Sequence, residues 1–301
     1  MTTSLRRLAY FLDVCETLHI GKSAERLGIA QPALSQQIKK LETELHVQLF
    51  RRRKRGIELT VAGEAYRVEV QRLLIMHEHA SKVAQRTARG ELGSVHVGYS
   101  GSAMFEPEFP ALLKGLREHF PGIQLTLRQQ PIEEQLEALE RGDLDIVVVR
   151  GPSGVLTTNQ RKQTGSRRPL IVALPSDHPL LAKPALSIAD LADEPMIGFN
   201  DPSNLAIQQI VRALADRAGI RLNVVWQVPE VASIMGLVAA GMGYGIVPAP
   251  IASLKIPSVS FRPMVEKDAY SELWYIWDVS RFTPAVERFL ELLRLHRFLP
   301  T

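Results

Sequence analysis

The stretch AERLGIAQPALSQQIKKLE, residues 24–42, has the pattern of two short amphipathic helices joined at a glycine. Ala24 and Leu27 give the first helix an inward face. Gly28 follows the helix at a position that commonly adopts the left-handed backbone conformation, which favours glycine. Pro32 is expected at the first position of the second helix, where its missing N–H has no cost. The pattern predicts a helix-turn-helix and raises the question of what the second helix contacts with its polar face.

The polar face of this second helix differs from an ordinary solvated surface. At 100° per residue, one apolar stripe is formed by Leu34, Ile38, Leu41 and Leu45. The opposite face carries small residues, amides and lysines instead of glutamates, namely Pro32, Ala33, Ser35, Gln36, Lys39 and Lys40. A first helical turn of small side chains can enter the major groove of DNA, where amides can hydrogen-bond base edges and cations can pair with phosphates. The face therefore favours DNA reading, with a merely solvated helical hairpin as the alternative.

A basic segment follows directly, FRRRKRGIELT at residues 50–60. Five consecutive basic residues before Gly56 predict a β-hairpin whose tip lies along a phosphate backbone and releases counterions there. Residues 1–60 contain eleven Lys and Arg against six Asp and Glu, whereas the rest of the chain is close to neutral. A basic run alone is usually a solvated surface, but after a helix-turn-helix it predicts a winged DNA-binding domain.

Length and composition limit the number of domains, the kinds of site and the cellular compartment that we expect. A chain of 301 residues with 46% apolar residues can form two or three domains. Its single cysteine, Cys15, excludes an internal disulfide and a cysteine-rich metal site, and it favours a reducing compartment. The first residues lack a signal-peptide apolar run, and the uncharged segment 231–254 is broken by glycines and prolines. We expect a cytoplasmic protein without membrane contact, metal or cofactor.

A long helix is predicted after the basic hairpin, from a Thr60 N-cap to a stop before Gly90. Its apolar positions recur at roughly helical spacing, at Val61, Ala65, Val68, Ile75, Ala80 and Val83. A helix of this length needs a partner, so pairing with the same helix of a second copy is the simplest expectation. Packing of the helix on its own protein body is the alternative.

Strands and helices then alternate in two similar sets. The first set has strands at 95–100, 123–129 and 145–150, with helices at 112–120 and 133–141. The second has strands at 170–175, 196–199, 222–228 and 244–248, with helices at 203–218 and 230–240, and the chain closes with a strand at 273–278 and a helix at 283–297. The alternation predicts parallel sheets covered on both faces, in two α/β lobes with a cleft between them. The chain is expected to cross between lobes near 161–166 and 265–270.

Polar groups are predicted to converge on this cleft. GYSGSAM (98–104) puts Ser100, Gly101 and Ser102 where a strand gives way to a helix, and NDPSNLA (200–206) puts Ser203 and Asn204 near another helix start. Helix starts offer free N–H groups and a favourable dipole to an anion. With Arg150 at a strand end, they predict a carboxylate ligand; a salt bridge between lobes or subunits is the alternative role for Arg150.

Residues 5–65 and four later landmarks resemble the LysR-type transcriptional regulators. The landmarks are SVHVGYS, GDLDIVVVR, LIVALPSDHPL and GLVAAGMGYGIVP. The resemblance implies a winged helix-turn-helix at 1–60, a dimerising linker helix at 61–90 and an effector domain at 91–301. That domain is expected to have two Rossmann-like lobes of the type II periplasmic-binding-protein kind, with lobe I at 91–162 and 268–301 and lobe II at 163–267.

The same resemblance assigns functions to particular residues. It places a set of side chains in the major groove or on the wing: Gln31, Pro32, Ala33, Ser35, Gln36, Lys39, Arg52, Arg53 and Arg55. It implies promoter DNA, a homotetramer and RNA polymerase as partners, and a small, often carboxylated effector between the lobes. Gln227 and Glu230 before GLVAAG, together with Arg150, resemble members that control aromatic-compound breakdown with muconate-like effectors.

Two other classes of protein compete with a ligand-responsive regulator. GYSGS resembles a serine-nucleophile elbow and would make Ser100 the nucleophile of a hydrolase, but Ser102 stands where glycine belongs. The histidines at 119, 178 and 296 are scattered, so nothing identifies a base, and no catalytic residue is predicted. A DNA-organising scaffold without an effector is the other alternative, against which the cleft landmarks argue.

Overall fold

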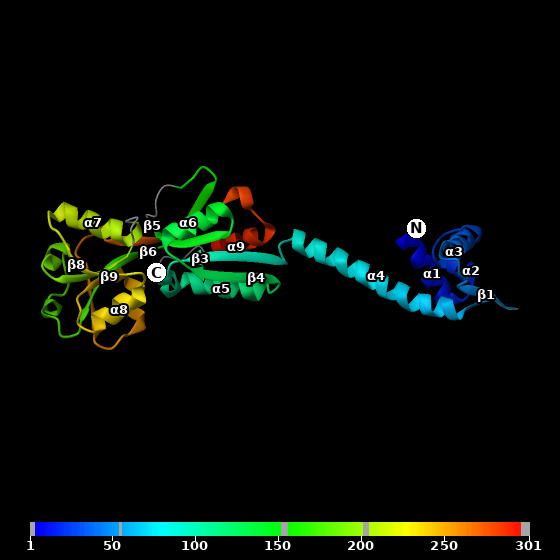
Figure 1. The fold of residues 1–301 in the computed structure, drawn as a ribbon, viewed down its shortest axis with the longest axis horizontal. Coiled ribbons are helices and arrows are strands. Elements are labelled where there is room, and N and C mark those ends of the chain that lie inside the picture. Colours follow the sequence, from blue (N-terminus) through cyan, green and yellow to red (C-terminus); the bar gives the residue numbers. More distant parts are fainter. Residues whose placement is uncertain (1–3, 54–55, 152–155, 201–204, 296–301) are drawn as a thin grey trace. The chain divides into compact units, whose positions relative to one another are not determined.

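The computed structural model describes residues 4–53, 56–151, 156–200 and 205–295. The chain divides into two compact units, residues 1–85 and 86–301. Helices dominate the first unit, whereas strands and helices alternate in the second (Figure 1).

The first unit is a helix-turn-helix with a two-stranded wing. Its elements are α1 (Leu5–Thr17), α2 (Ile20–Arg26), α3 (Gln31–Leu45), β1 (Phe50–Arg52), β2 (Ile57–Leu59) and all but the last three residues of α4 (Val61–Ala88). Gly28 has φ +65° between α2 and α3, as the glycine turn requires. Because α3 begins at Gln31, Pro32 is its second residue instead of its first, still within the turn whose N–H groups lack helical partners. The predicted helix pair and hairpin are confirmed.

The core of the first unit joins the helices to the wing. Leu34, Ile38 and Leu41 of α3 are buried against α1, as the apolar stripe predicts. The Phe11 ring lies 5.4 Å from that of Phe50 and 5.2 Å from that of Tyr66, so one aromatic group holds α1, β1 and the start of α4 together. This packing fixes the wing relative to α3.

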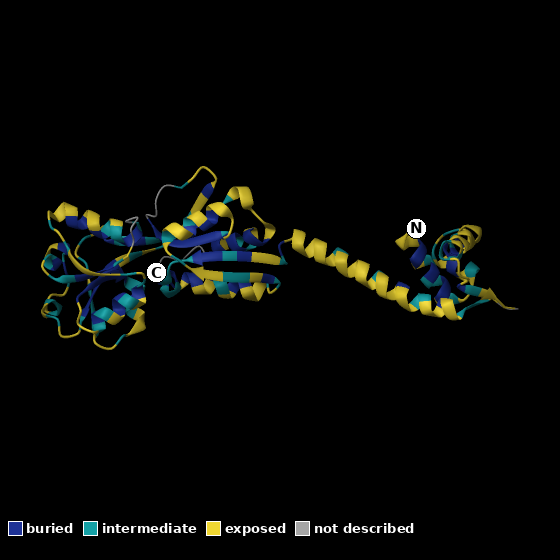
Figure 2. Ribbon diagram, in the orientation of Figure 1, coloured by how far each residue is buried: buried dark blue, intermediate teal, exposed yellow. Residues whose placement is uncertain are grey.

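Helix α4 has the predicted bounds and an exposed surface. Thr60 Oγ1 accepts the N–H of Gly63 at 2.9 Å as an N-cap, and Gly90 follows the helix with φ +68°. Val70 is buried in the first unit, but Ile75 and Met76 are each 68% exposed. Figure 2 shows that most residues of α4 are exposed to solvent.

The second unit contains nine strands and five α-helices among its described residues. The strands are β3 (Gly93–Tyr99), β4 (Ile123–Gln129), β5 (Ile146–Gly151), β6 (Gln160–Pro175), β7 (Pro195–Phe199), β8 (Asn223–Val228), β9 (Gly245–Pro248), β10 (Val259–Pro263) and β11 (Tyr270–Asp278). The helices are α5 (Glu108–His119), α6 (Ile132–Arg141), α7 (Ala206–Ala218), α8 (Val231–Ala239) and α9 (Pro284–Leu295). Short 3₁₀ turns are η1 (Gly101–Phe105), η2 (Pro179–Ala182), η3 (Ile188–Leu191), η4 (Ala249–Leu254) and η5 (Val279–Arg281).

The first lobe consists of β3, β4 and β5 with α5, α6 and α9. Side chains of β5 alternate between its two faces: Ile146 and Val148 pack with α5 and α9, whereas Val147 and Val149 pack with α6. All four are fully buried, which explains why the strand is a continuous apolar run. The lobe therefore has three layers.

The second lobe consists of β7 to β10 with α7 and α8 and repeats this arrangement. Leu170, Val172 and Leu174 of β6 pack with α7, whereas Ile171 and Ala173 pack with α8. Two three-layered α/β lobes confirm the predicted fold class.

The crossing strands correct two predictions. Residues 160–169 of β6 pair with β11 in the first lobe, and residues 170–175 of the same strand pair with β9 and β10 in the second. The first crossing therefore follows Pro169, later than the predicted 161–166, because one continuous strand serves both lobes. The sheets are also mixed: β3 is parallel to β4 and β5, but β11 and β6 run antiparallel to their neighbours.

Strand β10 was not predicted from the sequence. It is an edge strand that pairs with β6 alone, and its residues are only partly buried, so it lacks the apolar run of the central strands. As predicted, the segment 231–254 forms a helix (α8), a turn and a strand (β9); the 3₁₀ turn η4 that follows was not predicted. None of the described helices is both long and apolar enough to span a membrane.

Candidate DNA-reading surface and effector cavity

Helix α3 presents the predicted polar face to solvent. We call this face the reading face, and all six of its predicted residues are exposed: Gln31, Pro32, Ala33, Ser35, Gln36 and Lys39. Leu34 and Ile38, which alternate with them in sequence, are buried. The structure thus brings these six side chains onto one accessible helix surface.

The acids of α3 are turned away from the reading face and are occupied elsewhere. Glu42 Oε1 accepts the backbone N–H groups of Leu49 at 2.8 Å and Phe50 at 3.0 Å, which attaches the end of α3 to the wing. Glu44 pairs with Arg7 of α1 at 2.5 Å. The reading face therefore keeps Lys39 and its amides without a competing carboxylate, as contact with a polyanion requires.

The wing is a short antiparallel hairpin with basic side chains on its exposed strand. Arg51 lies opposite Glu58 in the register, and this carboxylate pairs with both Arg51 and Arg53. The hydrogen bond from Arg53 holds the pKa of Glu58 below its ordinary value. Arg52 is exposed and makes no salt bridge within the described part of the chain. The predicted wing residue Arg55 lies outside the described residues.

A turn at Gly56 anchors the wing to α1. Gly56 has φ +89°, and a Cβ there would approach the carbonyl oxygen of Leu18, so glycine is required on both grounds. The neighbouring Ile57 donates its N–H to the same carbonyl at 3.2 Å. The position of the wing is thereby tied to the helix-turn-helix.

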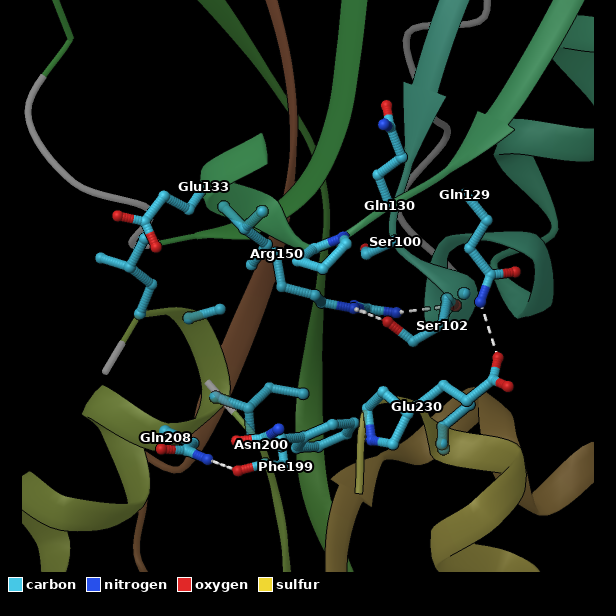
Figure 3. Close-up of a pocket in the computed structure, with 18 residues that line it drawn as sticks. Ser100, Ser102, Gln129, Gln130, Glu133, Arg150, Phe199, Asn200, Gln208 and Glu230 are labelled. Carbon is cyan, nitrogen blue, oxygen red and sulfur yellow. Dashed lines mark hydrogen bonds between the residues drawn. The ribbon is translucent and has the colours of Figure 1, made fainter. Parts of the chain in front are cut away.

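In the second unit, a cavity of about 300 Å³ lies between the two lobes and is called the cleft cavity below. Three α-helices begin at its wall, namely α6, α7 and α8, and the 3₁₀ turn η1 begins there too. Its apolar wall includes Ile132, Phe199, Ile207 and Val231. The described polar and charged residues that line it are Ser100, Ser102, Gln129, Gln130, Glu133, Arg150, Asn200, Gln208 and Glu230, shown in Figure 3.

Arg150 lies on the cavity wall but is already engaged by protein groups. Its guanidinium pairs with Glu106 at 2.5 Å, and both side chains are buried, at 2% and 0% exposure. It also donates to the hydroxyls of Ser102 and Ser271, each at 3.3 Å. Burial lowers the pKa of Arg150, and the Glu106 carboxylate acts in the opposite direction. Arg150 therefore lines the cavity as predicted, but its salt bridge is to Glu106 of the same lobe and not between lobes or subunits as in the alternative prediction.

Glu106 connects Arg150 to the strand that crosses between the lobes. Its second oxygen accepts from Arg168 Nε and from the Ser166 hydroxyl, both at 3.0 Å and both on β6. Glu108 nearby accepts the Ser166 N–H at 2.9 Å, and burial raises its pKa. The sequence analysis missed this buried acid pair, because EPE in a turn gives no signal of burial.

Two further polar contacts shape the cleft cavity. The hydroxyl oxygen of Ser100 is buried and has no hydrogen-bond partner among the described residues, so it is available to a ligand. Across the cleft, Gln129 of the first lobe donates its side-chain N–H to Glu230 Oε2 of the second at 2.6 Å (Figure 3). This hydrogen bond therefore joins the two lobes at the cleft cavity.

The structure places the predicted effector residues in three groups. Ser100, Gly101, Ser102, Arg150 and Glu230 line the cleft cavity. Ser203 and Asn204 lie outside the described residues.

Gln227 requires a correction. It lines a different cavity, of about 370 Å³, between α7 and strands β7 and β8. The reason is that Gln227 lies on β8, whose side chains alternate in direction, whereas Glu230 begins α8. Gln129, Glu133, Asn200 and Gln208 line the cleft cavity without having been predicted, since only the tertiary fold brings them there.

Ser100 has no catalytic surroundings in the described part of the chain. No histidine lines the cleft cavity there, and the Nδ1 of His119 lies 2.9 Å from its own helix carbonyl at Gly115. His296 lies outside the described residues. The described residues also contain no cluster of His, Cys, Asp and Glu that could hold a metal.

Comparison with known proteins identifies the family. Residues 5–64 match the bacterial regulatory helix-turn-helix protein, lysR family, and residues 88–297 match the LysR substrate binding domain. The chain belongs to the LysR family. It is a ligand-responsive, DNA-binding transcriptional regulator and not an enzyme.

Individual relatives are similar over nearly the whole chain. The HTH-type transcriptional regulator AlsR of Bacillus subtilis (strain 168) is 35% identical over 288 residues, covering 96% of this chain and 94% of AlsR. YnfL of Escherichia coli (strain K12), an uncharacterized HTH-type regulator, is 33% identical, covering 92% and 93%. The crystal structure of full-length CbnR with its target DNA has a TM-score of 0.85 at 27% identity, covering 97% of this chain and 99% of that one.

Proposed function

We propose that α3 enters the major groove of promoter DNA and reads it with the reading face. The observation that carries this proposal is an exposed surface of amides, hydroxyl and lysine from which Glu42 and Glu44 are turned away. Gln31 and Gln36 supply donors and acceptors for base edges, and Lys39 supplies charge for phosphates. The exposed Arg52 and Arg53 place the wing on the phosphate backbone. CbnR, which is similar in fold, is known in complex with its target DNA.

The cleft cavity is proposed to hold a small carboxylated metabolite. Support comes from the start of α6, α7 and α8 at its wall, because helix N-termini favour anions. The unpartnered Ser100 hydroxyl adds a hydrogen-bond donor at the same wall, and the Arg150 guanidinium places a cation there. No cofactor is proposed. Ligand binding changes DNA affinity only if the ligand prefers one arrangement of lobes or subunits over another.

The first experiment is thermal unfolding of the full chain with small carboxylates and their neutral analogues. A ligand at a hundredfold its dissociation constant adds about 2.7 kcal/mol of stability. A selective upward shift with carboxylates supports the proposal, and a shift with the neutral analogues alone contradicts it. Arg150→Ala should weaken ligand binding without weakening operator binding, with Arg161→Ala on the exposed start of β6 as the surface control. Because Arg150→Ala also leaves Glu106 buried without its partner, circular dichroism has to show that the variant is folded.

Assembly is proposed from two exposed apolar surfaces. On α4 the exposed apolar side chains include Val61, Ile75 and Met76, which suit pairing with a second copy of the helix. On the edge strand β8, Val224, Val225 and Trp226 are nearly half exposed and provide a second contact. We therefore propose a homodimer through α4 and a homotetramer through both surfaces. Analytical ultracentrifugation of Ile75→Glu and Val225→Glu tests the two contacts separately.

The remaining parts of the function stay predictions. Contact with RNA polymerase and action in the cytoplasm follow from the role of a promoter-bound regulator. Membership in the branch that controls aromatic-compound breakdown rests on Arg150 and Glu230, and calorimetry with cis,cis-muconate tests it directly.

A scaffold-type DNA-binding protein without an effector is the alternative. A footprint confined to one or two promoters favours the regulator, whereas uniform coating of DNA favours the scaffold.

A further inference from the structure

The wall of the cleft cavity carries more negative than positive side chains. Among the described residues that line it, Arg150 is the one cation, whereas Glu133 and Glu230 are both acids. A ligand with only a carboxylate would therefore enter a cavity whose own charges partly repel it. The ligand chemistry has to account for an acid at the wall as well as for the arginine.

The charge of Arg150 is balanced before any ligand arrives. Glu106 is fully buried beneath the cavity wall, and one of its oxygens lies 2.5 Å from Arg150 Nη2. Arg150 lines the cavity, but its ion pair with Glu106 reduces the net positive field that the cavity experiences. Binding of a bare anion therefore lacks the compensating charge that a buried ion needs.

Glu230 faces the cavity with a neutral partner. Its Oε2 accepts from the Gln129 amide at 2.6 Å, and it forms no salt bridge within the described part of the chain. A carboxylate at a cavity wall is a strong acceptor for a protonated amine, whose three N–H donors match it. Arg150 comes from β5 of the first lobe and Glu230 from the start of α8 in the second, so the two charges stand on opposite walls (Figure 3).

We propose that the effector is a zwitterion of the α-amino acid class, with its carboxylate at Ser100 and Arg150 and its ammonium at Glu230. The inference rests on the proposed carboxylate site and adds the second charge. Ile132, Phe199, Ile207 and Val231 form the apolar part of the wall, which favours an amino acid with an apolar side chain. One ligand then touches both lobes and can bias their arrangement.

The test compares matched probes on the full-length protein by isothermal titration calorimetry. The standard L-amino acids with apolar side chains are titrated first, and each that binds is compared with its α-hydroxy acid, its carboxamide and the amine without the carboxylate. L-Leucine, 2-hydroxy-4-methylpentanoate, leucinamide and 3-methylbutylamine form one such set. The amino acid is expected to bind at least tenfold more tightly than the other three.

Glu230→Gln sharpens the test, with Glu134→Gln on the exposed first turn of α6 as the matched control. Glu230→Gln should remove the preference for the amino acid over the hydroxy acid, and Glu134→Gln should retain it. Equal binding of amino acid and hydroxy acid by the unaltered protein overturns this inference and leaves the carboxylate site standing. Binding of the amine or the carboxamide as tightly as the amino acid overturns both, as does the absence of binding by every carboxylate tested.

Discussion

The reading face of α3 and the cleft cavity both present amides and hydroxyls, yet the chain forms them in opposite ways. The reading face comes from one helix of 15 residues, in which a 3.6-residue period separates buried from exposed positions. The cavity takes its lining from six separate segments between Ser100 and Val231. A functional surface on one helix can be derived from local periodicity, whereas a cavity between lobes depends on the fold that brings its segments together.

The two regions also handle charge differently. On α3 the acids are occupied by the protein, and the cations remain in solvent where DNA can reach them. In the cleft the cation Arg150 is occupied by Glu106, and the acid Glu230 faces the space instead. One region is prepared for a polyanion, and the other for a ligand that carries both charges.

The largest expected effect comes from the buried ion pair. Glu106→Ala leaves Arg150 buried without its carboxylate and should lower the free energy of unfolding of residues 86–301 by about 3 to 5 kcal/mol. Glu44→Ala breaks the more exposed Arg7 pair of the first unit and should cost about 1 kcal/mol or less. Urea unfolding followed by circular dichroism measures both. Equal losses would show that burial does not distinguish the two pairs.

The next effect concerns base reading by α3. Gln36→Ala should reduce the preference for the operator over unrelated DNA by about 1 to 3 kcal/mol, because its amide would no longer meet a base edge. Thr43→Ala, on the exposed last turns of the same helix, is the control. Fluorescence anisotropy with both DNAs gives the ratio. An unchanged preference in Gln36→Ala would remove this residue from the reading face.

The wing should contribute a smaller effect that does not depend on sequence. Arg52→Ala should weaken binding to operator and unrelated DNA alike and should reduce the salt dependence of binding by about one phosphate contact. Arg53→Ala should do less, because Arg53 shares its charge with Glu58. Titrations between low and moderate salt measure the slopes. A larger loss for Arg53→Ala than for Arg52→Ala would contradict the assigned pairing.

The smallest effect is a pH dependence within the second unit. Burial raises the pKa of Glu108 above its ordinary 4.5, so the folded protein keeps this proton to a higher pH than the unfolded chain. Stability should therefore fall as pH rises from 4.5 through the folded pKa, and it should stay lower above it. Glu108→Gln cannot ionise and should remove this fall in Tm. Identical profiles for both proteins would assign the pH dependence to other groups.

Much of the fold was predictable because its elements have strong local patterns. The helix pair, the wing, α4 and the central strand β5 follow from periodicity, glycine at a positive φ and a continuous apolar run. The missed features are those without such a pattern. The polar half of β6 is a strand only because β11 pairs with it, and β10 is a half-buried edge.

The residues of the candidate site can also be divided into those with a local sequence signal and those without one. Ser100, Gly101, Ser102, Arg150 and Glu230 follow strand ends or begin a helix, so sequence could propose them, and all line the cavity. Gln227 was assigned from spacing along the chain, and its direction on β8 carries it to the other cavity. Gln129 and Glu133 lie at a predicted strand end and helix start, but the sequence did not show that this junction faces the cleft.

The sequence by itself determined that the protein has a basic winged helix-turn-helix, a long helix and two α/β lobes, because helix and strand periods and local charge are properties of neighbouring residues. Only the tertiary structure decided that Arg150 meets Glu106 and that Glu230 faces the cleft cavity, since these residues lie far apart in the chain. Burial and charge pairing arise when distant segments pack, and they determine which side chains remain available to a ligand.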